Sequence, residues 1–147
     1  MKKILIYIVL IPLFGLFSCS KKEVLDEVPY IELVSVEPLE MIQFKDTLTI
    51  TIRYEDGNGD LGFADADSNA LYVHDQRLDK ADMFYVPPLA PLDAEVHISG
   101  KLDIQIGNTF LIGNGPSEKT RFYIKIRDRA GNMSNEIVTP EITILRE

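Results

Sequence analysis

The sequence lacks tryptophan and contains only one cysteine and two histidines. Because Cys19 is the only cysteine, an internal disulfide is excluded. His74 and His97 fall in different candidate strands, and neither belongs to an H-E-x-x-H zinc motif or accompanies a G-x-S-x-G nucleophile turn. Carboxylates are so frequent that no pair stands out as a general acid and base. The sequence therefore predicts a protein that is not an enzyme.

Basic residues are also scarce. The chain has 15 Lys and Arg against 23 Asp and Glu, a formal net charge of −8, and no cluster of Lys or Arg offsets it. Such a chain is repelled by nucleic acid and by anionic lipid. We therefore expect no nucleic-acid partner, whereas calcium, basic surfaces and neutral glycans remain plausible partners.

The N-terminus has the pattern of a signal peptide. Lys2 and Lys3 precede an apolar run over residues 4–17, which is too short for a comfortable membrane span. The run ends in Leu-Phe-Ser-Cys at residues 16–19, which resembles the lipobox of bacterial lipoproteins. An ordinary secretory signal with an incidental cysteine, or an N-terminal membrane helix, is the alternative.

The lipobox resemblance implies cleavage before Cys19 and acylation of that cysteine, which anchors the chain stably in a membrane. We expect a signal peptide over residues 1–18, a lipidated cysteine and tether over 19–29 and a domain over 30–147. Loss of residues 1–18 removes two lysines and changes the net charge to −10. Ser20 in place of an inner-membrane Asp signal favours an outer membrane lipoprotein, facing either the periplasm or the outside.

From residue 30 onward the apolar residues recur with period two, and no segment has the pattern of an amphipathic helix. The stretch TLTITIRYE (47–55) alternates most regularly, with Leu48, Ile50, Ile52 and Tyr54 on the inward face, and RFYIKIRD (121–128) repeats the pattern. Further candidate strands are 30–36, 70–76, 83–86, 95–99, 101–106, 109–112 and 141–145. Gly, Pro, Asn and Asp clusters separate them, so an all-β fold, an antiparallel β-sandwich of seven to nine strands, is predicted.

The stretch YIKIRDRAGNMSN (123–135) resembles the penultimate strand and following turn of bacterial immunoglobulin-like and fibronectin-III-like domains. Phe122 stands where such domains often carry a corner tyrosine, and it lacks the hydroxyl. The resemblance implies an immunoglobulin-like sandwich over residues 30–147. Together with the lipobox it identifies the chain as similar to the small immunoglobulin-like outer-membrane lipoproteins of Bacteroidota-type bacteria.

The stretch YEDGNGDLGFADAD (54–67) is the candidate calcium site. Asp56, Asn58 and Asp60 occupy positions 1, 3 and 5 of a calcium turn, and Asp67 occupies position 12. Leu61 at position 6 and the preceding strand exclude an EF-hand. In an immunoglobulin-like sandwich the loops after 47–55 and 121–128 share one end, so we expect Asp128 to approach this loop. The alternative is a wholly solvated glycine-rich turn.

Phe84 and Tyr85, beside Pro87, Pro88 and Pro91, are the candidate ligand-binding aromatic patch. The leading hypothesis is a lipid-anchored, non-catalytic binding or assembly module of the cell envelope with a structural calcium site. A glycan-binding accessory lipoprotein of a polysaccharide-uptake system is the alternative, and an exposed coplanar aromatic platform would favour it.

Overall fold

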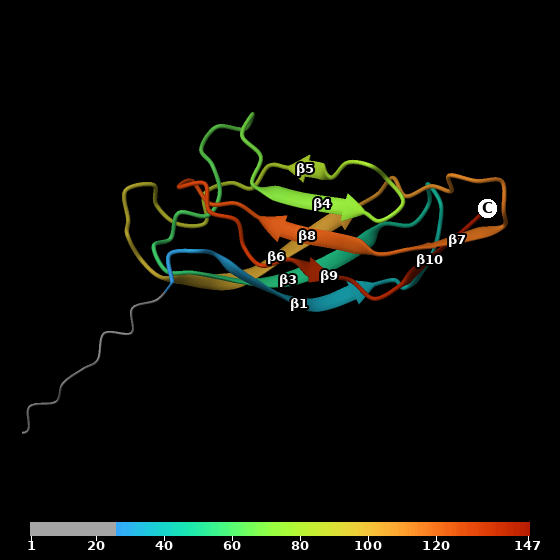
Figure 1. Ribbon diagram of the computed structural model, residues 1–147, viewed down its shortest axis with the longest axis horizontal. Coiled ribbons are helices and arrows are strands. Elements are labelled where there is room, and N and C mark those ends of the chain that lie inside the picture. The colour runs from blue at the N-terminus through green and yellow to red at the C-terminus, as the bar shows by residue number, and fades with distance from the viewer. Residues whose placement is uncertain (1–25) are drawn as a thin grey trace, which may run out of the picture.

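A computed structural model describes residues 26–147, which form an all-β domain without helices (Figure 1). The predicted signal peptide, the predicted lipid attachment site Cys19 and the first residues of the predicted tether lie outside the described residues. Within the described residues no helix is long and apolar enough to span a membrane.

Ten strands make up the domain. They are β1 (Tyr30–Glu37), β2 (Glu40–Ile42), β3 (Leu48–Asp56), β4 (Leu71–Asp75), β5 (Asp82–Phe84), β6 (Ile98–Ile106), β7 (Ser117–Thr120), β8 (Phe122–Ile126), β9 (Ile137–Val138) and β10 (Ile142–Leu145). The predicted seven to nine strands are too few, because the short strands β2, β7 and β9 carry no clear alternation of apolar residues.

The strands form three sheets with the orders β1-β3-β6, β5-β4-β8-β9 and β2-β10-β7. The pairing is antiparallel throughout except between β10 and β2, which run parallel and depart from the predicted all-antiparallel arrangement. Figure 1 shows the β4 and β8 sheet above the β1, β3 and β6 sheet, as in a β-sandwich.

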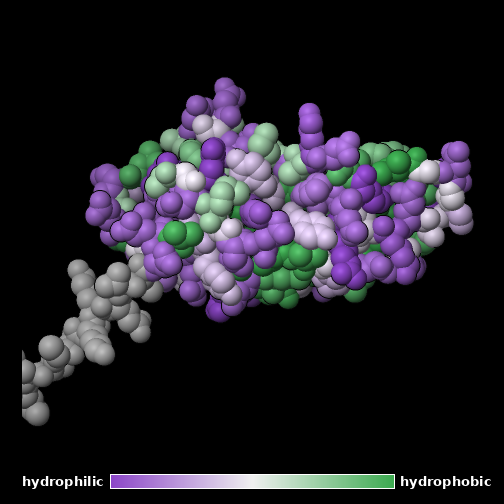
Figure 2. Space-filling view, in the orientation of Figure 1, coloured by the Kyte–Doolittle hydropathy of each residue, from purple (hydrophilic) through white to green (hydrophobic). Residues whose placement is uncertain are grey.

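The core lies between the β1-β3-β6 sheet and the β5-β4-β8-β9 sheet, and buried residues of β2 and β10 extend it. Ile50 and Ile52 of β3 and Ile124 and Ile126 of β8 are fully buried in one cluster with residues of the other strands. The period-two patterns of β3 and β8 therefore correctly identify the two central strands. Figure 2 shows mostly hydrophilic side chains on the face in view, with smaller hydrophobic areas between them.

The sequence predicts two strands, 95–99 and 101–106. The structure has one strand instead, β6, which runs without a break from Ile98 to Ile106. Gly100 is not a turn residue. It lies opposite Tyr54 of β3, and a Cβ atom at this position would collide with the Tyr54 ring and hydroxyl. The glycine therefore makes room for a cross-strand tyrosine ring.

Residues 109–112 form no strand, contrary to prediction. Side chains replace the expected strand partners here. The Leu111 amide donates to the side-chain oxygen of Gln43 (3.2 Å), and the Ile112 amide donates to a Glu118 carboxylate oxygen (3.0 Å). The apolar residues of this segment therefore lie in an irregular connection.

Candidate metal centre

Two aspartates continue the inward faces of the two central strands. Asp56 is the last residue of β3 and takes the core-facing position after Ile52 and Tyr54. Asp128 takes the corresponding position two residues after Ile126 of β8. Their exposed fractions are 1% and 0%, so both carboxyl groups are buried where apolar side chains are the rule.

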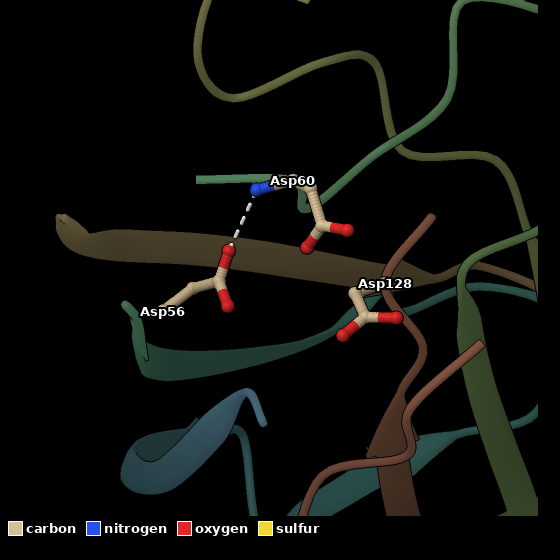
Figure 3. A group of neighbouring side chains, drawn as sticks. All are labelled: Asp56, Asp60 and Asp128. Carbon is tan, nitrogen blue, oxygen red and sulfur yellow. Dashed lines mark hydrogen bonds between the residues drawn. The ribbon is translucent and has the colours of Figure 1, made fainter. Parts of the chain in front are cut away.

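Asp60 completes the group, hereafter the aspartate cluster. One carboxylate oxygen from each of Asp56, Asp60 and Asp128 lies within 4.8 Å of the others. Two oxygens bound to one calcium ion at 2.3–2.6 Å are at most about 5 Å apart, so a single cation can contact all three. Figure 3 shows the three carboxylates, from the end of β3, the loop after it and the segment after β8, pointing toward a common space. The predicted approach of Asp128 to Asp56 and Asp60 is confirmed.

Hydrogen bonds position the carboxylates without neutralising them. The Asp60 amide donates to Asp56 Oδ2 (2.8 Å), and the Ala130 amide donates to Asp60 Oδ2 (3.1 Å). Asn132 donates its backbone amide to Asp128 Oδ1 (2.7 Å) and its side-chain amide to Asp128 Oδ2 (2.8 Å). These bonds orient the side chains but add no positive charge.

Two oxygens of the cluster have no partner. Asp56 Oδ1 and Asp60 Oδ1 are buried and accept no hydrogen bond, and no ion pair reaches the cluster from any basic side chain of residues 26–147. Unpartnered buried carboxylate oxygens are costly, and a bound cation is one of the ways to relieve that cost. The donor set consists of oxygens alone, which suits a hard cation such as calcium.

The electrostatics of the cluster agree with its geometry. Burial raises the pKa of Asp56, and the negative charges of Asp60 and Asp128 raise it further against the hydrogen bond from the Asp60 amide. Burial also raises the pKa of Asp60, and the charge of Asp128 adds to that effect. Without a cation, the ionised forms of both side chains are therefore disfavoured in the folded state.

Leu61 explains why this loop is not an EF-hand. Its side chain is fully buried in the core, and its backbone forms an isolated bridge with Asp128. Gly59 and Gly62 on either side have φ angles of 74° and 81°, and a Cβ atom at these positions would collide with the carbonyl oxygens of Val96 and Pro87. The loop is therefore fixed by core packing and by the 87–96 segment.

Arg129 supports the loop from the other side. Its backbone amide donates to the Asp60 carbonyl oxygen (3.1 Å), and its guanidinium donates to the carbonyl oxygens of Gly62 (3.1 Å) and Gly59 (3.5 Å). The guanidinium thus binds carbonyl oxygens and no carboxylate of the cluster. Burial raises the pKa of Asp60, and the positive charge of Arg129 offsets only part of that rise.

The other predicted ligands do not join the cluster. Asn58 Oδ1 accepts a long hydrogen bond from the Asp60 amide (3.4 Å), and Asn58 lines a neighbouring cavity. Asp67 is exposed, and its amide donates to Asp65 Oδ1 (3.0 Å). The local spacing placed Asp67 near the cluster, but the chain turns away after the buried Leu61. The alternative of a wholly solvated turn is wrong for Asp56 and Asp128, which are buried.

A cavity of about 440 Å³, hereafter the acidic cavity, opens beside Asp60. It is lined by Glu27, Asn58, Asp60, Leu92, Asp93, Ala94, Glu95 and Arg129. A smaller cavity of about 70 Å³ contains His97 and Asp56. His74 instead contacts the Leu78 carbonyl oxygen through Nε2 (2.7 Å). Neither histidine forms an ion pair with a carboxylate within residues 26–147.

Both residues of the predicted aromatic patch line one cavity of about 160 Å³, which also borders β6. Phe84 is half-buried against the core, whereas Tyr85 is exposed. The sequence did not reveal a second aromatic site formed by Phe44 and Phe110, hereafter the aromatic pair. Its rings are parallel to within 6°, with centroids 6.2 Å apart, and are 69% and 38% exposed.

The chain matches no protein-family model, no curated protein and no solved structure at the significance that each comparison requires. The all-β fold and the aspartate cluster are therefore the features from which a function can be inferred.

Proposed function

We propose that the chain is a lipid-anchored, non-catalytic module of the cell envelope, with an immunoglobulin-like β-sandwich whose aspartate cluster binds calcium. The observation that supports the calcium site most directly is the convergence of three carboxylates, of which Asp56 and Asp128 are buried and Asp56 and Asp60 each have an unpartnered oxygen. The sheet orders β1-β3-β6 and β5-β4-β8-β9 support the immunoglobulin-like assignment, because β3 and β8 then end at the same end of the sandwich.

In this proposal the cation has a structural role. It joins the end of β3 to the segment after β8, so it connects one sheet to the other at the point where the apolar core stops. A cation that binds only the folded state stabilises it by about 2.7 kcal/mol when its concentration is 100 times the dissociation constant. The oxygen-only donor set favours calcium over the softer transition metals.

Calorimetric titration of calcium into the full chain, purified in detergent and freed of metal by a chelator, tests the proposal. We expect one bound calcium per chain and a higher melting temperature with calcium than with chelator. Asp128→Asn should abolish both effects. Asp67→Asn makes the same chemical change at an exposed residue outside the cluster and should preserve both. Absence of binding to the unsubstituted chain would refute the calcium site.

The lipid anchor has its own test, because Cys19 lies outside the described residues. Cys19→Ala should release the protein from the membrane fraction, while a conservative change at its neighbour, Ser20→Ala, should leave it there. Retention of the Cys19→Ala variant in membranes would contradict the anchor.

The aromatic pair favours glycan binding as a second candidate function. Phe44 and Phe110 form an exposed, parallel pair of rings, and Phe110 supports Phe44 from one side. Exposed apolar patches can mark ligand-binding surfaces, and the two rings offer an apolar face to a sugar. Affinity electrophoresis in gels containing neutral polysaccharides should show retardation that Phe44→Ala removes. Met83→Ala, which truncates another exposed apolar side chain, is the matched control.

A further inference from the structure

The tether enters the domain beside the aspartate cluster. The amide of Gly57 donates to the carbonyl oxygen of Asp26 (3.0 Å), and Glu27 lines the acidic cavity together with Asp60. Asp26 follows Cys19 by seven residues, and a chain of that length spans at most about 25 Å. Acylation of Cys19 would therefore hold this end of the domain within about 25 Å of the membrane.

The opposite end is farther away. Strand β3 runs from Leu48, near the aromatic pair, to Asp56 in the cluster, and nine residues of strand extend about 27 Å. Figure 1 shows the described chain beginning at one end of the domain and the C-terminus lying near the other. The acidic cavity is thus at the membrane-proximal end and the aromatic pair at the distal end.

The acidic cavity can bind charges of both signs. Its wall carries the carboxylates of Glu27, Asp93 and Glu95 together with the guanidinium of Arg129. Asp60 belongs to both the cavity and the cluster, so a cation bound by the cluster borders the cavity. Calcium takes six to eight oxygen ligands, more than the unpartnered cluster oxygens supply, so positions remain for oxygens of water or of a ligand.

We propose that the acidic cavity binds phosphoethanolamine headgroups of the membrane in which the chain is anchored. The inference rests on the proposed calcium site, because the cation supplies the binding positions for the phosphate, with Arg129 as a second positive group. The ammonium group is held by the carboxylates of Glu27, Asp93 and Glu95. These carboxylates disfavour purely anionic headgroups. The tether keeps headgroups at a high effective concentration, so weak intrinsic affinity is sufficient.

The absence of tryptophan from the chain allows a single introduced tryptophan to report on the membrane. Leu92→Trp places the reporter at the acidic cavity. Ile112→Trp is the control, because Ile112 lies outside the acidic cavity and is as exposed as Leu92 (54% and 56%). The lipidated chain is reconstituted in phosphatidylcholine vesicles containing brominated phosphatidylethanolamine or brominated phosphatidylglycerol. We expect calcium-dependent quenching of the Leu92→Trp variant by the phosphatidylethanolamine vesicles only. Equal quenching by both lipids, or equal quenching of both reporters, would overturn the proposal.

Removal of the cavity carboxylates tests the ammonium contacts. The double substitution Asp93→Asn, Glu95→Gln should abolish the preference for phosphatidylethanolamine and leave calcium affinity unchanged. Asp79→Asn with Asp82→Asn removes two exposed carboxylates outside the cavity and should have no effect. Soluble phosphoethanolamine should bind the calcium-loaded chain about tenfold more tightly than inorganic phosphate does, a difference of about 1.4 kcal/mol.

Calcium titration without lipid separates the two proposals. If calcium does not bind, the proposed metal site and this inference both fail. If calcium binds but phosphatidylethanolamine quenches no better than phosphatidylglycerol, only the headgroup inference is wrong. Melting curves of each variant, recorded with calcium, establish that a lost signal is not caused by unfolding.

Discussion

Asn132 binds Asp128 through both of its amide groups, with the backbone nitrogen 2.7 Å from Oδ1 and the side-chain nitrogen 2.8 Å from Oδ2. The Asp128 amide in turn donates to the Asn132 carbonyl oxygen (3.1 Å). The turn after β8 therefore fixes the orientation of a buried carboxylate that faces Asp56 and Asp60. Groups that orient a metal ligand in this way commonly affect metal affinity without contacting the metal.

Asn132→Ala removes the side-chain hydrogen bond and keeps the backbone one. We expect calcium affinity to fall by about 10- to 100-fold, the usual effect of losing an outer-shell partner. Calorimetric titration measures the change. Asn114→Ala, an exposed asparagine in the turn before β7, is the control, and an affinity loss as large for this variant would contradict the assignment.

Asp56→Asn should have opposite effects on the metal-free and the calcium-loaded protein. Without calcium, the substitution removes a buried charge whose pKa is raised by burial and by Asp60 and Asp128. The free energy of unfolding should rise by on the order of 1 kcal/mol. Adding calcium should not raise the free energy of unfolding of the variant, because one of the proposed calcium ligands is lost. Denaturant unfolding with chelator and with calcium checks both signs, and destabilisation in chelator would contradict the repulsion.

The acid stability of the domain should depend on a second polar group, near the start of β8. Arg77 forms ion pairs with Asp75 (2.7 Å) and Glu118 (2.8 Å), and Thr120 also donates to Asp75. Burial by itself would raise the pKa of Asp75, but the hydrogen bonds from Arg77 and Thr120 outweigh it and lower the pKa from 3.8.

A lowered carboxyl pKa stabilises the folded state at every pH above the unfolded value, and this contribution is lost as the pH falls below it. We therefore expect the melting temperature, measured in chelator, to fall below about pH 4. Thr120→Val should make that fall less steep, because one of the hydrogen bonds that lower the pKa is gone. Glu141→Gln, in an exposed pair with Lys119, is the control and should change little.

Phe44 should carry measurable backbone strain. It has a φ angle of 59°, in the left-handed region that residues with a Cβ atom rarely adopt, and its amide donates to the Thr109 carbonyl oxygen (3.1 Å). Phe44→Gly relieves the strain, whereas Phe44→Ala removes the ring and keeps it. Denaturant unfolding should find the glycine variant more stable than the alanine variant by about 1 kcal/mol. Equal stability would mean that the conformation is not strained.

The sequence predicted those parts of the fold and site that depend on local alternation. The inward residues of β3 and β8 could be read from period two, and the same alternation places Asp56 and Asp128 inside. Predicting that Asp56 and Asp128 meet also required the assumption of an immunoglobulin-like strand order, because the two residues lie far apart in the chain. Both steps succeeded because the two central strands alternate regularly between buried and less buried residues.

The remaining features depend on contacts between distant residues. Gly100 was interpreted as a break because its partner, the Tyr54 ring, belongs to another strand. A backbone hydrogen bond joins Phe44 to Thr109, and Leu61 packs into the core while Asp67 stays exposed. None of these contacts has a signature in the local pattern.

The position of β6 at the edge of its sheet bears on solubility. Within residues 26–147 this nine-residue strand pairs only with β3, and a long unpaired edge is a template for aggregation between chains. The exposed charges of Lys101 and Asp103 oppose such pairing. Pro87 borders the same cavity as Leu102 and Ile104, and it has no amide hydrogen to extend the sheet. Copies of this domain at high concentration would thus be protected from joining edge to edge.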